Sequence, residues 1–168
     1  MRHWLAAGLV SGAMLLVAGC GFTPMYGGGE NINPAADLSN FDVQIPRERT
    51  AQLVRNELLR NTPPAAIGNA PYVLRLAMKK EERTLLTTSG ALARQKRMRL
   101  KARYSLYRRN EKKPLVTGET FADAPFVTTR EHLASEHARM QAERAAARKV
   151  AEDIRRRLAL FFAGQRGQ

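Results

Sequence analysis

A long alternation of side-chain types between about Arg94 and Arg109 sets the strongest limit on how this chain can fold. Apolar residues occupy every second position, and the positions between them carry a row of cations. The apolar set is Met98, Leu100, Ala102, Tyr104 and Leu106, and the cationic set is Arg97, Arg99, Lys101 and Arg103. Because successive side chains of a β-strand point to opposite sides of the sheet, the alternation predicts a strand with one buried and one basic face.

Two shorter alternations and one returning segment predict further strands. Residues 40–45 and 72–79 carry apolar side chains at every second position, and the second of these strands can continue through residues 84–88. A returning strand at residues 115–124 follows a polar turn. The connections among the last three strands are short, so we expect these strands to pair antiparallel.

Two other segments have the period of a helix. In residues 47–61, Ala51, Val54 and Leu58 recur on one side, and a pair of prolines stops the helix. A capping box at residues 128–131 then predicts the start of a long helix that runs to about Phe162. Its expected buried stripe is Leu133, His137, Met140, Ala147, Ala151, Ile154, Leu158 and Phe161.

The predicted order of elements is strand, helix, three strands, helix, which indicates an α+β fold. Two helices packed on one face of a four-stranded, mainly antiparallel sheet would bury the apolar sides of all six elements. The basic side of the third strand then lies on the other face of the sheet. That face is either open or covered by a partner.

The N-terminus has the layout of a cleavable export signal. Arg2 precedes an uncharged apolar run from Leu5 to Val17, which is shorter than the roughly 20 residues of a membrane-spanning helix. Small residues then lead into Cys20, the only cysteine of the chain, whose thiol can carry a diacylglycerol. We therefore expect a signal peptide at residues 1–19 and a lipid anchor on Cys20. The alternative is an ordinary secretory signal with a chance cysteine.

The rest of the chain divides into a tether and a single domain. Residues 20–39 are rich in Gly, Pro and Asn, and we interpret them as a lipidated N-terminus and tether. Residues 40–168 carry all of the periodic segments, and we expect them to form a single α/β domain around one modest core.

A formal net charge of +13 predicts an anionic partner. Nucleic acid would be the first interpretation of such a charge, but an export signal argues against it. Aromatic residues suited to base stacking are also sparse in the basic strand. The abundant polyanions that an exported, membrane-anchored protein encounters are phospholipid head groups and the phosphates of lipopolysaccharide.

The sequence CGFTPMYG at residues 20–27, followed by the helix QLVRNELLRN, the strands and the long last helix, resembles the LptE family of lipopolysaccharide-assembly lipoproteins. The resemblance implies an outer-membrane lipoprotein on the periplasmic side, with no enzymatic activity and no cofactor, the lipid on Cys20 being an anchor. It also implies that the domain is seated as a plug inside the LptD β-barrel. Such a protein binds lipopolysaccharide, helps to deliver it to the outer leaflet and helps the barrel to fold.

In that family, basic side chains near the second and third strands contact lipid phosphates. The positions that fit here, as lipopolysaccharide or barrel contacts, are Arg94, Lys96, Arg97, Arg99, Lys101 and Arg103. The returning strand departs from the pattern, because it carries Glu119 and Asp123 and no basic residue. The cations of the row should repel one another, and surface charge pairs stabilise a fold little, so fold stability alone does not account for the row. The alternative is a solvated strand face that discourages edge pairing.

Catalysis and metal binding find little support in the sequence. His132 and His137 are five residues apart on a helix, which is poor geometry for one metal ion. The other functional class that stays open is an envelope lipoprotein that acts as a scaffold or pilot for another secretion or outer-membrane complex. It would share the anchor but not bind lipopolysaccharide.

Overall fold

A computed structural model describes residues 41–60, 70–86 and 93–166 of the chain. The predicted signal peptide, Cys20 and the tether lie outside these ranges. The described elements are β1 Phe41–Gln44, α3 Arg49–Leu59, β2 Tyr72–Leu86, β3 Ala93–Arg108, β4 Pro114–Thr129 and α4 His132–Arg166. Their order and types confirm the α+β fold predicted from the sequence.

The four strands form one mixed sheet in the order β1-β2-β3-β4. Strand β1 is parallel to β2, because α3 carries the chain back to the end of the sheet at which β1 began. The long strands β2, β3 and β4 pair antiparallel along nearly their whole length, as predicted. Strand β2 is continuous to Leu86, so residues 84–86 of the predicted extension belong to the same strand, and residues 87 and 88 lie outside the described ranges.

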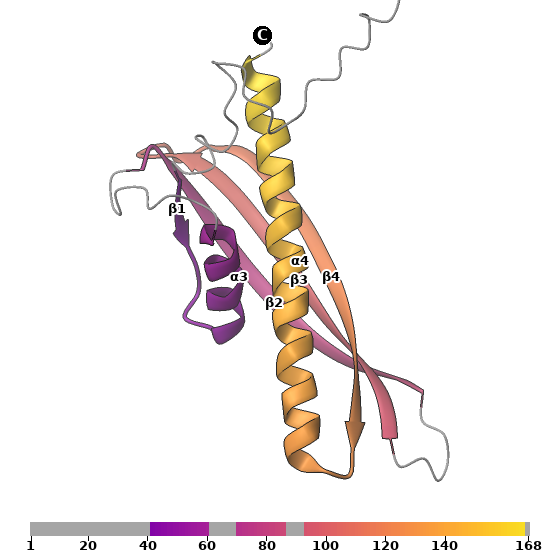
Figure 1. The fold of residues 1–168 in the computed structure, drawn as a ribbon. Coiled ribbons are helices and arrows are strands. Elements are labelled where there is room, and N and C mark those ends of the chain that lie inside the picture. Colours follow the sequence, from indigo (N-terminus) through magenta and orange to yellow (C-terminus); the bar gives the residue numbers. More distant parts are fainter. Residues whose placement is uncertain (1–40, 61–69, 87–92, 167–168) are drawn as a thin grey trace, which may run out of the picture. The chain divides into compact units, whose positions relative to one another are not determined.

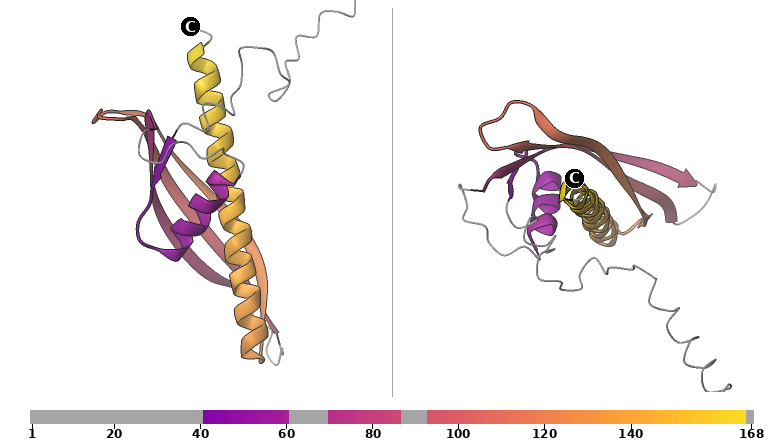
Figure 2. Two further views of the ribbon diagram at one scale, coloured as in Figure 1. Left: turned by 60° about the vertical axis from the view of Figure 1, so that its left-hand side comes forward. Right: turned by 90° about the horizontal axis from the view of Figure 1, so that it is seen from above.

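Both helices cover the same face of the sheet (Figure 1), and Figure 2 shows the curved sheet on one side of the pair. The core lies between these layers and contains the alternating apolar residues of β3 together with one stripe of each helix. Its largest fully buried side chains are Leu58, Leu74, Met98, Leu100, Leu106, Ile154, Leu158, Val54 and Val150.

The start of α4 differs from the prediction. Residues 128 and 129 still belong to β4, and Glu131 precedes the helix, so no capping box forms. Instead, the backbone N–H of Thr129 donates to Ser135 Oγ at 2.9 Å. Leu133 is 70% exposed and His137 is also exposed, so the buried stripe begins later than predicted. The helix face of the sheet becomes polar towards this end of α4, where Glu82 of β2 pairs with Arg139 at 2.6 Å in place of an apolar contact.

Neither of the two described helices has the length and apolarity needed to cross a membrane.

Candidate functional site: a basic sheet face

The face of the sheet that points away from the helices, called the outer sheet face below, carries the predicted row of cations. Arg97, Arg99, Lys101 and Arg103 alternate along β3 with buried core residues, so all four side chains leave the sheet on the side without helices. The structure therefore brings these four sequence-predicted residues together on one surface.

The other two predicted residues lie on the opposite face. Lys96 pairs across the sheet with Phe126, which is a buried core residue. Arg94 differs from Lys96 by two positions and therefore shares its face. The six residues of the predicted site do not form one cluster, because the pleat of β3 divides them between two surfaces.

The register of the strands arranges the outer sheet face in rows that run across β2, β3 and β4. Residues directly opposite one another on a sheet face interact, with like charges destabilising and opposite charges stabilising. Three neighbouring rows are Ala77–Arg103–Glu119, Lys79–Lys101–Phe121 and Glu81–Arg99–Asp123.

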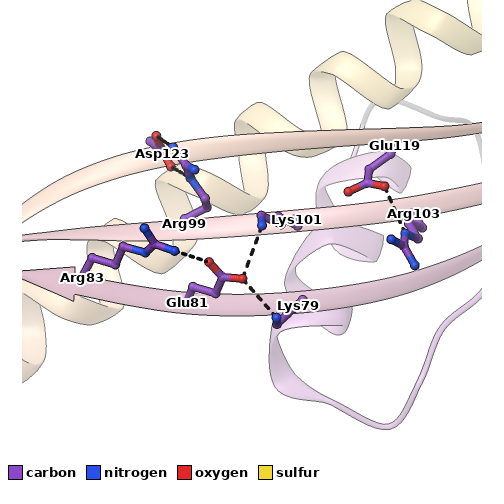
Figure 3. Close-up of polar contacts among 8 residues, drawn as sticks. All are labelled: Lys79, Glu81, Arg83, Arg99, Lys101, Arg103, Glu119 and Asp123. Carbon is purple, nitrogen blue, oxygen red and sulfur yellow. Dashed lines mark hydrogen bonds and ion pairs between the residues drawn. The ribbon is translucent and has the colours of Figure 1, made fainter.

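Arg99 and Asp123 form the tightest ion pair of this face (Figure 3). Arg99 Nε donates to Oδ1 of Asp123 and Nη2 donates to Oδ2, both at 2.7 Å, so one edge of the guanidinium is fully used. Arg97 Nη1 adds a longer contact of 3.6 Å to the same carboxylate. The hydrogen bonds from Arg99 hold the pKa of Asp123 below its ordinary value, and they raise the pKa of Arg99.

The flat side of the Arg99 guanidinium lies over the ring of Phe121, with 5.0 Å from its central carbon to the ring centroid. The ring itself is 61% exposed. A cation over an aromatic face is attracted by the ring quadrupole. Arg99 is thus held both at its edge and on its face.

The carboxylate of Glu81 on β2 forms ion pairs with three cations (Figure 3). Its Oε1 lies 3.2 Å from Lys79 Nζ and 3.4 Å from Lys101 Nζ, and its Oε2 lies 3.8 Å from Arg83 Nη2. The hydrogen bond from Lys79 is the largest cause of a lowered pKa for Glu81, and Lys101 adds to it. One carboxylate leaves much of this positive charge unbalanced.

Next to Glu81 the outer sheet face is hollowed. The hollow, called the Ala77 hollow below, has a volume of about 370 Å³. Two of the residues that line it are bonded to each other: Arg103 Nε donates to Glu119 Oε2 at 3.1 Å, and these two side chains are 78% and 53% exposed. The residues that line the hollow are Ala77, Met78, Lys79, Lys101, Arg103 and Glu119.

The expectation of a mutually repelling cationic row needs correction. Each of the four cations has an acidic partner on a neighbouring strand, supplied by Glu81, Glu119 or Asp123. From the sequence, Glu119 and Asp123 of the returning strand indicated only that this strand lacks a basic contact. The register of the sheet places both acids beside the arginines of β3. Sequence reasoning also missed Lys79 as a site residue, although the alternation of β2 placed it on the polar side of that strand.

A second polar cluster lies on the helix side. Glu143 of α4 is buried, and its Oε1 accepts a hydrogen bond from Thr50 Oγ1 of α3 at 2.5 Å. Lys80 Nζ of β2 lies 3.4 Å from the same oxygen. Burial raises the pKa of Glu143, but the hydrogen bond from Thr50 and the charge of Lys80 outweigh burial, and the pKa is lowered. The cluster joins both helices to the sheet and lies on the face opposite the Ala77 hollow.

In the part of the chain that the structure describes, no group of three or more His, Cys, Asp or Glu residues could hold a metal ion. His132 and His137 are both exposed on α4. The chemistry that the outer sheet face offers is the binding of anions.

Comparison with known families gives a match to the family described as LptE, lipopolysaccharide-assembly, over residues 38–158. This range includes every described strand, all of α3 and most of α4. A search of the curated proteins finds no match.

Several solved structures share the fold. A presumed lipoprotein from Caulobacter crescentus CB15 superposes with a TM-score of 0.68 at 19% identity, covering 79% of this chain and 96% of its own. A minor lipoprotein from Acinetobacter baumannii gives 0.53 at 14% identity, covering 71% and 91%. Lipoprotein B from Nitrosomonas europaea gives 0.51 at 13% identity, covering 73% and 83%. At these identities the likeness concerns the fold alone.

Proposed function

The chain belongs to the LptE family of lipopolysaccharide-assembly proteins, and on this premise we propose that it is a lipid-anchored protein that binds lipopolysaccharide through its outer sheet face. The anchor is Cys20, and the membrane is the outer membrane, with the domain on its periplasmic side. The partner is an LptD-type β-barrel, in whose lumen the domain acts as a plug and assists delivery to the outer leaflet.

The observation that carries this proposal is the concentration of cations on the one face of the sheet that the helices leave uncovered. Arg97, Arg99, Lys101 and Arg103 project from it, and Lys79 and Arg83 of β2 stand beside them. Acidic side chains on the same face are fewer, so the face keeps an excess of positive charge. Arg and Lys bind phosphate by charge-assisted hydrogen bonds, and lipid A carries phosphates.

The first test is affinity purification of the full-length lipoprotein from detergent-solubilised membranes, with mass spectrometry of what stays bound. We expect a stoichiometric outer-membrane β-barrel together with lipopolysaccharide. Recovery of a different envelope complex without lipopolysaccharide would overturn the proposal and support a scaffold or pilot function.

The anchor is tested separately. Replacing Cys20 by alanine removes the thiol that would carry the lipid, so we expect loss of a metabolic acyl label and release of the protein from membranes. A Cys20→Ala variant that stays on the membrane and keeps the label would contradict the lipidation site.

A further inference from the structure

We propose that the Ala77 hollow is a phosphate-binding subsite formed by Lys79, Lys101 and Arg103. In this subsite Glu119 forms an ion pair with Arg103, and a bound phosphate group replaces Glu119 in that pair. The inference deepens the proposed function, because it names the part of the basic face that receives the phosphate. It also separates the residues of the row into those that bind and those that position.

Space for a ligand exists because of one small residue. Ala77 lies directly opposite Arg103 on the outer sheet face, between longer side chains along the same strand, Arg75 and Lys79. A methyl group at this position leaves the floor of the hollow open, and the surrounding side chains form its walls. A volume of about 370 Å³ is enough for a phosphate group with part of the sugar that carries it.

Charge at the hollow is left unbalanced by the register. Lys79 and Lys101 are direct cross-strand partners, and the third member of their row is Phe121, so this row contains no acid. Like charges placed directly opposite destabilise a sheet. Both ammonium groups share one oxygen of Glu81, at 3.2 Å and 3.4 Å. Because a lysine has three N–H donors, both keep donors for an anion in the hollow.

Arg103 supplies the third set of donors. Its only ion pair in the described structure is with Glu119, through Nε at 3.1 Å. Both side chains are largely exposed, and such a pair stabilises the fold little. A phosphate that binds this guanidinium therefore displaces only a weak contact, the ion pair with Glu119. The positive charges of both lysines attract it as well.

Arg99 stands in contrast to Arg103. Its edge is committed to both oxygens of Asp123 at 2.7 Å, and its face lies on Phe121. The side chain is 30% exposed, against 78% for Arg103. Arg99 is therefore a positioning residue that fixes β3 against β4 and holds the Phe121 ring beside Lys101.

The phosphate could belong to a lipid head group or to a small soluble compound. Phe121 favours the lipid, because an exposed ring in the same row as the two lysines offers apolar contact next to the charged subsite. The experiment therefore uses both kinds of probe, lipopolysaccharide and inorganic pyrophosphate.

The variants are Lys79→Ala, Arg103→Ala and Glu119→Gln in the full-length lipoprotein, purified in detergent and titrated with lipopolysaccharide. We expect the first two each to weaken binding about tenfold, the loss typical of one charge-assisted hydrogen bond. Glu119→Gln should tighten binding several-fold, because the side chain that competes with phosphate for Arg103 loses its charge. The matched control is Arg108→Ala, which removes an exposed arginine of the same strand, paired with Glu111 at 3.2 Å, outside the hollow. It should change binding less than twofold.

The outcomes separate the subsite from the proposed function. Tight lipopolysaccharide binding that depends on Arg97 and Arg99 but not on Lys79, Arg103 and Glu119 would overturn the subsite and leave the function standing. Absence of lipopolysaccharide binding, with pyrophosphate binding that is lost in Arg103→Ala, would overturn the proposed function and support a subsite for a soluble phosphate. Binding of neither probe would overturn both.

Discussion

Glu143 is the residue at which both helices and the sheet meet, and its burial makes it a sensitive point of the fold. It accepts a hydrogen bond from the buried Thr50 and faces Lys80. Replacing Glu143 by alanine leaves the Thr50 hydroxyl and the Lys80 ammonium without this acceptor. We expect a loss of about 1–3 kcal/mol in the free energy of unfolding, measured by urea denaturation.

The matched control for that prediction is Glu152→Ala on the same helix, where the side chain is exposed. An exposed substitution of this kind should stay within about 0.5 kcal/mol of the parent. Equal effects at the two positions would show that the contacts of Glu143 do not stabilise the protein.

The face on which each side chain of β3 lies was predictable from the sequence, but its partner was not. Alternation alone placed Met98 inside and Arg97 outside, because the pleat of a strand is a local property. The ion pair between Arg99 and Asp123 depends on the register between β3 and β4, which the whole sheet determines. For the same reason Lys79 entered the site only when β2 was paired with β3.

At the scale of elements, Gly118 of β4 allows the core to close over Tyr104. A Cβ built at Gly118 would lie 2.8 Å from Tyr104 Cε1 and closer still to the end of the ring, and Tyr104 is only 4% exposed. Because the ring is buried, it would have to shift against its neighbours to make room for a Cβ, so Gly118→Ala should destabilise the protein by about 1–3 kcal/mol.

Gly164 in α4 provides the opposite case for the same substitution. A Cβ there meets nothing within 4 Å, and alanine is the better helix former by about 0.5–1 kcal/mol. Gly164→Ala should therefore leave stability unchanged or raise it slightly. Thermal unfolding of the two variants side by side tests the pair, and a destabilised Gly164→Ala together with a neutral Gly118→Ala would contradict both assignments.

Helix α3 depends on α4 for its C-terminal end. It has no acidic residue in its first turn and no basic residue in its last turn, so its own sequence does not complement the helix dipole. Arg155 of α4 donates through Nη2 to the carbonyl oxygens of Glu57 and Leu58, at 2.8 Å and 2.7 Å. The packing of α4 against α3 brings this arginine to the carbonyls.

We expect Arg155→Ala to lower the free energy of unfolding by about 1–2 kcal/mol, because two carbonyls at the end of α3 lose a charged donor. Its neighbour Arg156 is exposed and pairs with Asp153 one turn away, so Arg156→Ala should cost about 0.5 kcal/mol or less. Urea denaturation of both variants measures the difference. If Arg156→Ala proves the more damaging change, the contact between the helices is not what the Arg155 side chain contributes.

For the whole molecule, the number, type and order of the elements followed from hydrophobic period. The boundary between β4 and α4 did not, because the Thr-rich segment suited both a strand end and a capping box. The sequence motif at Cys20 pointed to the family that residues 38–158 then matched. The division of the basic residues between two faces, and the Ala77 hollow, needed the assembled sheet.

The carboxylates that hold the outer sheet face and the helix layer together also set the response of the fold to acid. The pKa values of Glu81, Asp123 and Glu143 are all lowered in the folded protein. Near pH 4 the unfolded chain therefore binds more protons than the folded chain. The stabilisation from these groups is complete above the ordinary values of 3.8 for Asp and 4.5 for Glu, and it is lost as the pH falls through the lower folded values.

We accordingly expect the free energy of unfolding to change little between neutral pH and about pH 5, and to fall steadily below about pH 4. The variant Glu81→Gln/Asp123→Asn should be less stable than the parent at pH 7 and should lose less on acidification, so that the two curves converge at low pH. Urea denaturation at a series of pH values measures both. Parallel curves would mean that the acid response arises elsewhere, and that the ion pairs across β2, β3 and β4 add nothing to the stability of the sheet.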